Sequence, residues 1–334
     1  MDSLTQIVLG AAVGEAVLGK KVGNKALLWG AIAGTIPDLD VLAKVFFDDV
    51  TANEIHRGFS HSIVFSLLAS PVFGWLIAKV YKKSEVTWRD WSRLMFWGLF
   101  THPILDAFTT WGTQLFWPLD YRIAFNSIFV VDPLYTLPFL GFVIAAMFYK
   151  RNHPKRAKLN WLGIGISTTY LLSTLVIQFF ATQQFEQHLK KQNISYEAIQ
   201  TRPTPFNTIL WTANVKTKDS FLIGYYSFFD TKDSISFLQF SKNYQLLEPV
   251  ENAPIVQRLK KLTNQWYAME KKNDNLFLND LRFGVLGVDI KSPEFVFGYK
   301  LYEEDGVVKA KEKERDMSEA SGLLASLWDR IRGK

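Results

Sequence analysis

The stretch IVFSLLASPVFGWLIAKVY (63–81) decides the fold class, because it is almost wholly apolar over nineteen residues. A helix of about 20 mainly apolar residues is long enough to cross the hydrocarbon core of a bilayer. Directly before it stands EIHRGFSHS (54–62), which brings two imidazoles and a guanidinium to the start of the apolar run. The stretch therefore predicts a transmembrane helix with a polar cluster at one end.

Five further apolar segments accompany this one, and together they predict a polytopic α-helical membrane domain over residues 1–181. We place the six segments at about 4–19, 26–47, 61–81, 93–116, 127–149 and 159–181. The first is short and contains Glu15, and the second is interrupted by Pro37, Asp38 and Asp40. Non-helical backbone is tolerated at membrane depth when it packs on protein or lines a cavity. We therefore expect the first two segments to be short or broken helices.

Residues 182–334 have an ordinary soluble composition and predict a small α+β domain outside the membrane. Alternating apolar and polar runs predict strands within 202–230, 234–242 and 295–304. Helical spacing predicts helices over 182–200, 254–270 and 318–332. No catalytic constellation stands out in this half. We expect it to stabilise the protein as a cap, to cover the membrane site or to bind a partner.

The formal net charge of +6 does not indicate nucleic-acid binding, because the basic residues of the first half lie in loops. Twelve of the sixteen Lys and Arg in residues 1–181 fall in three short loops, 20–25, 82–93 and 150–158. Basic loops between apolar segments mark the cytoplasmic side of a membrane. The N-terminus and residues 182–334 are then expected outside. The opening MDSLTQ lacks the basic start of a cleaved signal peptide.

With this orientation, ionisable residues from distant parts of the chain fall at the outer face of the membrane. They are Asp38, Asp40, His56, His61, His102 and Asp106. Ionisable groups inside membrane segments cost at least about 2.5–3.5 kcal/mol each on insertion scales, and they usually mark function. In HPILD (102–106) an imidazole and a carboxylate are four positions apart, which puts both on one face of a helix.

These six side chains are predicted metal ligands, because imidazole with carboxylate suits zinc, manganese or iron better than calcium. Thiolate sites and disulfides are excluded, since the chain has no cysteine. We expect one or two divalent ions, with zinc first and manganese or iron as alternatives. Arg57 is expected to hold an anionic substrate oxygen. Asp40, as a carboxylate not fully engaged by metal, is the expected general base.

Simpler interpretations exist for each of these signals. An imidazole and a carboxylate four positions apart are most often a structural hydrogen-bonded pair, and two aspartates one residue apart are a weaker signal still. Asp132 and Asn126 either orient the imidazoles or belong to the loop that caps the fifth segment. Asp2 is expected to cap the first helix, and His153 and His188 are expected at the surface.

Four motifs give the chain a resemblance to a known family. They are MDSLTQ (1–6), GAIAGTIPDLD (30–40), HRGFSHS (56–62) and THPILDAFTTWGTQLFWP (101–118). Over about residues 1–150 the chain resembles the YdjM-like family of bacterial inner-membrane proteins, described as membrane-bound metal-dependent hydrolases. The resemblance implies metal binding by Asp38, Asp40, His56, His61, His102 and Asp106. Many members carry a histidine where this chain has Gln6.

The expected function is that of an integral hydrolase of the bacterial cytoplasmic membrane, with the lipid bilayer as its partner. A metal-activated water would attack an amphipathic or lipid-linked, anionic substrate such as a phosphoester at the outer leaflet. One alternative is a transporter of metal ions or solutes, because broken helices and buried carboxylates also line ion paths. Another is a membrane-anchored interaction protein with a structural metal.

Overall fold

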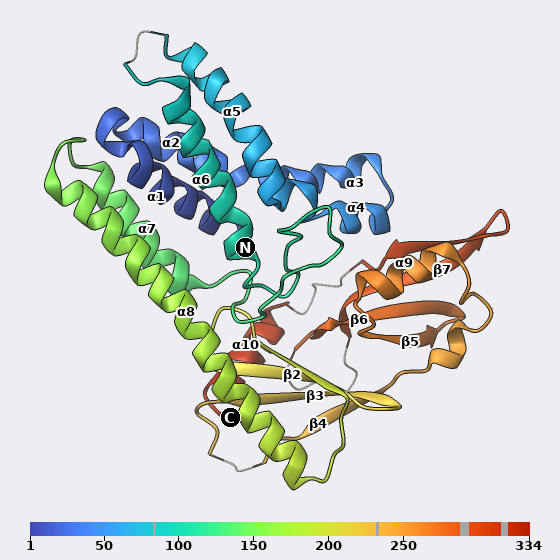
Figure 1. Cartoon of the computed structure of the whole chain (residues 1–334). Helices are drawn as coiled ribbons and strands as arrows, with labels where there is room; N and C mark the ends of the chain where they lie inside the picture. Colours follow the sequence, from blue (N-terminus) through green and yellow to red (C-terminus); the bar gives the residue numbers. More distant parts are fainter. Residues whose placement is uncertain (83–84, 232–233, 288–293, 315–319) are drawn as a thin grey trace. The chain divides into compact units, whose positions relative to one another are not determined.

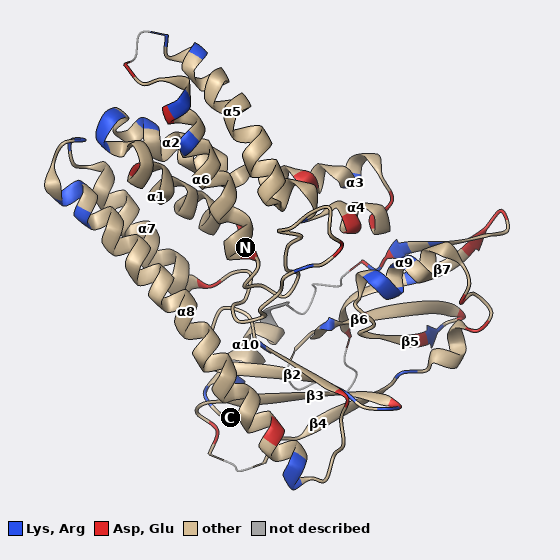
Figure 2. Cartoon of the chain, viewed as in Figure 1, with Lys and Arg blue, Asp and Glu red and all other residues tan. Residues whose placement is uncertain are grey.

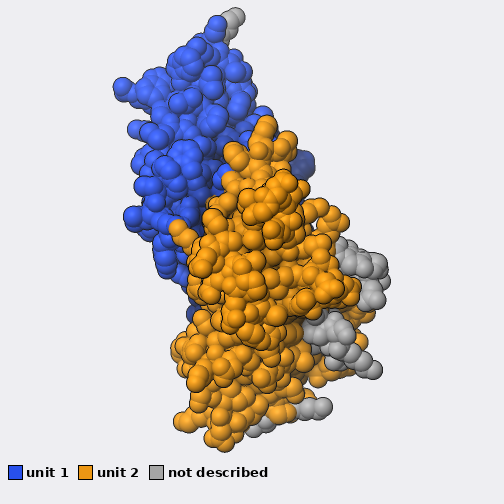
Figure 3. All heavy atoms as spheres, turned by 90° about the vertical axis from the view of Figure 1, so that its right-hand side faces the viewer, with its two compact units in different colours: residues 1–43, 55–176, 205–207 blue, residues 44–54, 177–204, 208–334 orange. Residues whose placement is uncertain are grey.

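The computed structural model describes residues 1–334 apart from 83–84, 232–233, 288–293 and 315–319 (Figure 1), and Figure 2 marks the charged residues in the same view. The chain forms two compact units, distinguished by colour in Figure 3. The first unit consists of residues 1–43, 55–176 and 205–207, and the second of residues 44–54, 177–204 and 208–334. Each unit encloses hydrophobic clusters of its own.

The first unit is built mainly from helices. They are α1 (Ser3–Val22), α2 (Asn24–Thr35), α5 (Ile63–Val80), α6 (Trp88–Asp106), α7 (Pro133–Met147) and the first part of α8 (Pro154–Lys191). Helix α1 packs against α2, α6 and α7, while α6 also packs against α2 and α5. The metal ligands predicted near the end of α6 are therefore surrounded by other helices of the unit.

Helices α1 and α2 pack with their backbones in contact, because glycines line both sides of the crossing. A Cβ atom at Gly30 would overlap the carbonyl oxygen of Gly10, and one at Gly14 would overlap the carbonyl oxygen of Ala26. Small residues let helices approach closely in a bilayer, where van der Waals packing drives their association. Gly23 makes the turn between the helices with a φ of 61°, a conformation that favours glycine.

The second predicted segment is broken, and the break creates part of the site. Helix α2 ends at Thr35, and Pro37, which has no N–H to donate, begins the next element two residues later. The chain continues as the 3₁₀ helix η1 (Pro37–Leu42) and the short helix α3 (Ala43–Phe46). Asp38 and Asp40 thus lie in η1, beyond the end of α2.

The prediction of about six membrane segments is confirmed only in part. In the part of the chain that the structure describes, three helical stretches are long and apolar enough to cross a membrane: residues 24–46, α5 and α8. Helix α7 is apolar but has 15 residues. Helices α1 and α6 form near the predicted positions, but both carry several charged residues, among them Glu15 in α1 and Asp90 in α6.

The second unit contains two antiparallel sheets of four strands, in which each strand pairs with its neighbour in the sequence. The first sheet consists of β1 (Ala198–Pro203), β2 (Leu210–Lys216), β3 (Ser220–Ser227) and β4 (Phe237–Ser241). The second consists of β5 (Tyr267–Lys272), β6 (Asn275–Val285), β7 (Phe295–Glu304) and β8 (Val307–Glu312). Helices α9 (Pro254–Leu262) and α10 (Ala320–Ile331) complete the unit, which is an α+β fold.

Residues 44–54 belong to the second unit, although they lie between two parts of the predicted site. In α4 (Asp49–Ile55), Val50 is fully buried in a cluster with residues of the second sheet. The side-chain amide of Asn53 donates to the hydroxyl of Tyr299 over 3.0 Å. The chain therefore leaves the first unit after Ala43, shortly beyond Asp40, and returns to it at Ile55, just before His56.

The predicted elements of the second half agree with the structure in part. A hairpin, β2–β3, lies within 202–230, and β7 matches the strand predicted at 295–304. The helix predicted over 254–270 ends at Leu262, and β5 follows from Tyr267. Of the predicted helix 318–332, residues 318–319 lie outside the described residues.

The predicted domain boundary after residue 181 falls inside α8, which continues without interruption to Lys191. The two compact units divide instead between residues 176 and 177. The helix predicted beyond the last apolar segment is therefore present as far as 191. His188, predicted at the surface, is buried, and its Nδ1 donates to the carbonyl oxygen of Gln184.

Candidate metal centre

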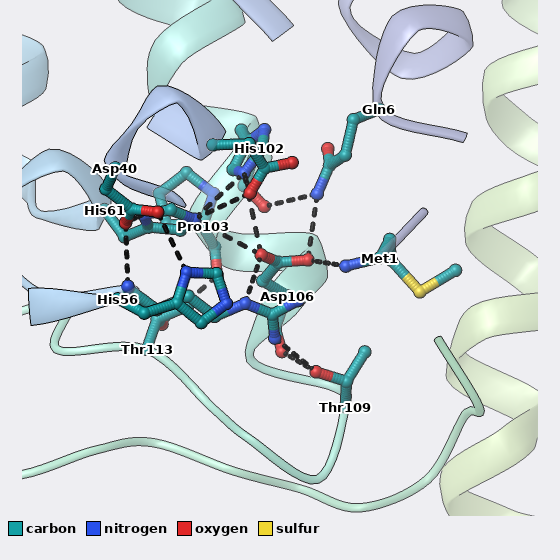
Figure 4. A network of polar contacts seen from close by, with 12 residues as sticks. Met1, Gln6, Asp40, His56, His61, His102, Pro103, Asp106, Thr109 and Thr113 are labelled. Carbon is teal, nitrogen blue, oxygen red and sulfur yellow. Dashed lines mark hydrogen bonds and ion pairs between the residues drawn. The ribbon is translucent and has the colours of Figure 1, made fainter. Parts of the chain in front are cut away.

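Four of the six predicted ligands converge in the first unit: Asp38, His61, His102 and Asp106. One ligand atom from each lies within 4.8 Å of the others. They come from η1, from the 3₁₀ helix η2 (Phe59–His61) and from the last turn of α6, and Figure 4 shows the polar network around them. His61, His102 and Asp106 are buried, whereas Asp38 is partly exposed.

The separations between the ligand atoms suit one small divalent ion. Nε2 of His61 lies 3.1 Å from Nε2 of His102. Both nitrogens lie 3.4 Å from Oδ1 of Asp38, and they lie 3.4 and 3.5 Å from Oδ2 of Asp106. A tetrahedral site with bonds of about 2.0–2.1 Å has ligands about 3.3 Å apart. The five separations that involve an imidazole nitrogen are therefore close to those around a single ion of this size.

Hydrogen bonds at the far side of each ring turn both imidazoles toward this point. Nδ1 of His102 lies 2.6 Å from the carbonyl oxygen of Gly34, which can only accept, so this nitrogen carries the proton. Nδ1 of His61 lies 3.2 Å from Oδ2 of Asp40 and is held in the same way. Each Nε2 then offers a lone pair to the other ring, an arrangement that a cation between them stabilises.

Asp106 divides its two oxygens between structural partners and the centre. Oδ1 accepts a hydrogen bond of 2.9 Å from the side chain of Gln6 and pairs with the ammonium group of Met1. Oδ2 is buried and has no hydrogen-bond partner in the described part of the chain, although Nε of Arg57 lies 3.0 Å away. A buried acceptor without a donor is costly, so this oxygen also fits a metal ligand.

Asp40 lies beside the four converging residues and contacts one of them, His61. Its Oδ1 accepts from Nδ1 of His56 over 2.8 Å. Its Oδ2 accepts from the backbone N–H of Arg57 over 2.8 Å and from the hydroxyl of Ser60 over 2.9 Å, besides facing His61. Both oxygens are thus occupied by donors. Ser60 was not predicted, although it stands between the two histidines of one motif.

His56 also lies beside the converging residues, with its ring centroid 6.1 Å from that of His61. Its side chain is 25% exposed. Burial lowers the pKa of the imidazole and the neighbouring Arg57 lowers it further, against the opposing effect of Asp40. His56 is therefore neutral at pH 7. Its Nδ1 keeps the proton and donates it in the hydrogen bond to Asp40, and its Nε2 can accept a proton.

The guanidinium of Arg57 faces the buried carboxylate and not the solvent. Its side chain is 6% exposed, and its Nη1 donates to the hydroxyl of Thr109 over 2.7 Å. Its backbone has a φ of 58°, which is uncommon for a residue other than glycine and often marks a functional constraint. Thr109 was not predicted, and nothing in its sequence context distinguishes it from other threonines.

Two further polar residues act as helix caps. Asp132 accepts from the backbone N–H of Leu134 and of the next residue, so it caps α7. Asp2 accepts from the backbone N–H of Thr5 and caps α1, as predicted. Asn126 lies in the loop before α7 with a φ of 57°. For Asp132, the structure favours capping over orienting an imidazole.

Apolar helices long enough to span a bilayer, together with a buried group of two histidines and two aspartates, define a membrane protein with a possible metal site. A model of the family YdjM inner membrane protein matches residues 1–184, which contain all four converging residues. The chain belongs to this family, which confirms the prediction made from its four motifs. No curated protein and no solved structure matches the chain.

Proposed function

We propose that this protein is an integral membrane metal-dependent hydrolase in which Asp38, His61, His102 and Asp106 hold one divalent ion. The observation that carries the proposal is the convergence of two imidazole nitrogens and two carboxylate oxygens within 4.8 Å of one another, with each nitrogen 3.1–3.5 Å from the other three atoms. This donor set suits zinc, with manganese or iron as alternatives. When bound, such an ion lowers the pKa of a coordinated water and polarises the bond to be cleaved.

His56 is the general base that we propose, in place of Asp40. The neutral imidazole can accept a proton at Nε2, while the hydrogen bond from Nδ1 to Asp40 fixes the ring and stabilises the imidazolium that forms. Asp40 is less suited to take the proton itself, because both of its oxygens already accept hydrogen bonds. Asp40 is thus a positioning residue for His56 and His61.

Arg57 balances the negative charge of Asp106 from a distance of 3.0 Å. Its buried position means that the anion-binding role expected from the sequence would require the guanidinium to turn away from Asp106. In the state described here it keeps the Asp106 carboxylate in place, together with the side chain of Gln6.

The substrate that we propose is amphipathic or lipid-linked, and it is cleaved at the outer leaflet. Exposed apolar side chains alternate with the polar residues of the centre, which supports this class. Leu39, between the two aspartates of η1, is 57% exposed, and Phe59, next to Ser60, is 43% exposed. The ring of Phe59 packs edge-on against Trp117, with the centroids 4.9 Å apart. A phosphoester remains our choice for the cleaved group.

Elemental analysis of detergent-purified protein tests the metal centre. We expect about one ion per chain in the wild type and in the control His153→Ala, whose histidine is exposed. We expect its loss in His102→Ala. A folded wild-type protein that takes up no zinc, manganese or iron would contradict the proposal.

Hydrolysis is tested separately with His56→Gln, which leaves the four proposed ligands intact. This variant should keep its metal and lose turnover in a screen of phosphoesters and lipid-linked substrates. If the metal-loaded wild type cleaves no member of a broad screen, the centre is not hydrolytic. If His102→Ala loses folding together with metal, the metal is a structural element.

A transporter is the second candidate, favoured by the break between α2 and η1, since broken helices often line substrate paths. An ion path would need further available polar groups across the unit. The carboxylate of Glu15 in α1 is instead held at both oxygens by Arg156, over 2.7 and 2.6 Å. Metal flux into liposomes that contain the protein distinguishes the two functions, because the hydrolase should show none.

A further inference from the structure

A cavity of about 540 Å³ lies where the turn between α1 and α2 meets the connection between α7 and α8. None of the proposed metal ligands lines it. Its walls include Asn24, Met147, Lys150, Arg151 and Arg156. It is an open depression, large enough to take a small polar group such as a phosphate. The cavity is thus a second candidate binding site, separate from the metal centre.

The buried guanidinium of Arg156 forms a fixed and electrically neutral part of the wall. It makes a bidentate ion pair with Glu15, and its Nη1 donates to the side-chain oxygen of Asn24 over 2.7 Å and to the carbonyl of Tyr149 over 2.9 Å. Because Glu15 cancels its charge, the positive charge of the cavity comes from other residues.

Lys150 and Arg151 supply that charge. Both are exposed, and Nη1 of Arg151 donates to the backbone carbonyl of Lys21 over 2.6 Å. Neither forms an ion pair with a carboxylate among the residues that the structure describes. Figure 2 shows further Lys and Arg gathered where α1 turns into α2 and where α7 turns into α8. The site therefore has two uncompensated positive charges for an anion.

The position of the cavity along the helices points to the surface of the bilayer. Asn24 begins one of the candidate spans, and another, α8, begins at Pro154, just after Lys150 and Arg151. Apolar side chains lie next to the basic ones: Met147 is 43% exposed and Phe148 is 84% exposed. Basic side chains beside exposed apolar ones, at the start of two spans, match an amphiphile with an anionic headgroup.

We propose that this cavity binds the phosphate headgroup of an anionic phospholipid, with Lys150 and Arg151 as its charged contacts. Basic pockets between membrane helices are suited to such headgroups, because each cation near the surface adds to the attraction. The phosphate group is common to phospholipids and to free phosphate. The exposed Met147 and Phe148 favour the lipid, whose acyl chains they can contact.

Native mass spectrometry of the full chain, with equal amounts of phosphatidylglycerol and phosphatidylcholine in detergent, tests the proposal. The variant is Lys150→Gln/Arg151→Gln. The matched control is Lys155→Gln/Lys158→Gln, which removes the same charge from exposed positions on α8 outside the cavity lining. We expect one retained phosphatidylglycerol per chain in the wild type and the control. In the cavity variant we expect the affinity for phosphatidylglycerol to be lower by a factor of about ten or more.

A further variant, Lys150→Arg/Arg151→Lys, keeps the charge and should keep the lipid, which separates charge from folding. If the cavity variant and the control lost phosphatidylglycerol equally, the proposal would be overturned, because the lipid would then be attracted by basic residues in general. No preference for phosphatidylglycerol over phosphatidylcholine would also overturn it. Displacement of the lipid by millimolar inorganic phosphate would assign the cavity to the free ion instead. Metal content should be the same in all four proteins, so this result is independent of the proposed hydrolase.

Discussion

The partners of each Nδ1 fix the direction in which the imidazoles of the centre offer their lone pairs, and for His61 they include the hydroxyl of Ser60, 3.0 Å away. The backbone carbonyl of Gly34 holds His102, and the carboxylate of Asp40 holds His61. Partners of this kind determine the tautomer and raise the basicity of the ligand. At the scale of residues, the affinity of the proposed centre for an ion would therefore depend on atoms that do not bind it.

Replacing Asp40 with Asn tests this dependence. The amide cannot accept from His56, Arg57, Ser60 and His61 as the carboxylate does, so we expect metal affinity to fall about 10–100-fold. Turnover should fall as well, because His56 loses its partner. Competition with a chromogenic chelator measures the affinity. The control is Asp274→Asn, at an exposed turn where asparagine suits the φ of 58°. Unchanged affinity in Asp40→Asn would remove Asp40 from the centre.

The four converging residues could be singled out in the sequence because ionisable side chains in apolar segments are conspicuous. The contribution of Gly34 could not, because every residue has a carbonyl and only the fold shows which one faces His102. The separate role of Asp40 was also hidden. Two aspartates one residue apart point in different directions on a 3₁₀ helix with three residues per turn, and the spacing does not say which of them reaches the ion.

At the scale of elements, the close crossing of α1 and α2 depends on the absence of side chains from its glycines. Gly30→Ala should destabilise the protein by about 1–3 kcal/mol or more, because the new methyl group meets the backbone of α1, which cannot move aside easily. Thermal unfolding in detergent measures the effect. The control is Gly141→Ala in α7, where no atom lies within 4 Å of the added Cβ. Equal stability of the two variants would contradict the close packing.

The ion pair between Glu15 of α1 and Arg156 of α8 links two helices inside the first unit. Glu15→Gln should cost about 3–5 kcal/mol, because it leaves a buried guanidinium without its counter-charge. The double variant Glu15→Leu/Arg156→Met removes both charges and should recover much of the loss. Urea or thermal unfolding gives the comparison. If Glu15→Gln had the same free energy of unfolding as the wild type, water would have to reach the ion pair.

Helix positions were easier to predict than helix ends. The apolar run 63–81 corresponds to α5, because burial in lipid leaves a strong compositional signal. The fourth segment, predicted to continue to residue 116, ends as a helix at Asp106. Beyond it the chain forms hydrogen bonds with distant segments, such as that from the backbone N–H of Gln114 to the carbonyl oxygen of Arg57, and these cannot be seen in a local pattern.

At the scale of the whole molecule, orientation in the membrane stays a prediction that rests on the basic loops. The absence of cysteine makes it directly testable with single cysteine variants. A membrane-impermeant maleimide should label Tyr121→Cys in intact cells, whereas Lys158→Cys should react only after permeabilisation. Both positions are exposed in the structure. The reverse pattern would place the metal centre at the cytoplasmic face.

The α+β class of the second unit was predicted, but the pairing of its strands in two sheets was not. Strand β7 was visible from its alternating residues, whereas β5, β6 and β8 were missed. The inclusion of residues 44–54 was also missed, because the contact from Asn53 to Tyr299 joins positions 246 residues apart. Contacts over such separations depend on the complete fold and leave no local pattern.

Gly34 and Gln6 face each other where α1 crosses α2, and a Cβ atom on Gly34 would overlap the carbonyl oxygen of Gln6. The carbonyl of Gly34 aligns His102, and the side chain of Gln6 aligns Asp106. The spacing of these two ligands is therefore set by how closely two main chains can approach. A single methyl group at this contact would change the selectivity of the centre among ions of different radius, while every ligand kept its identity.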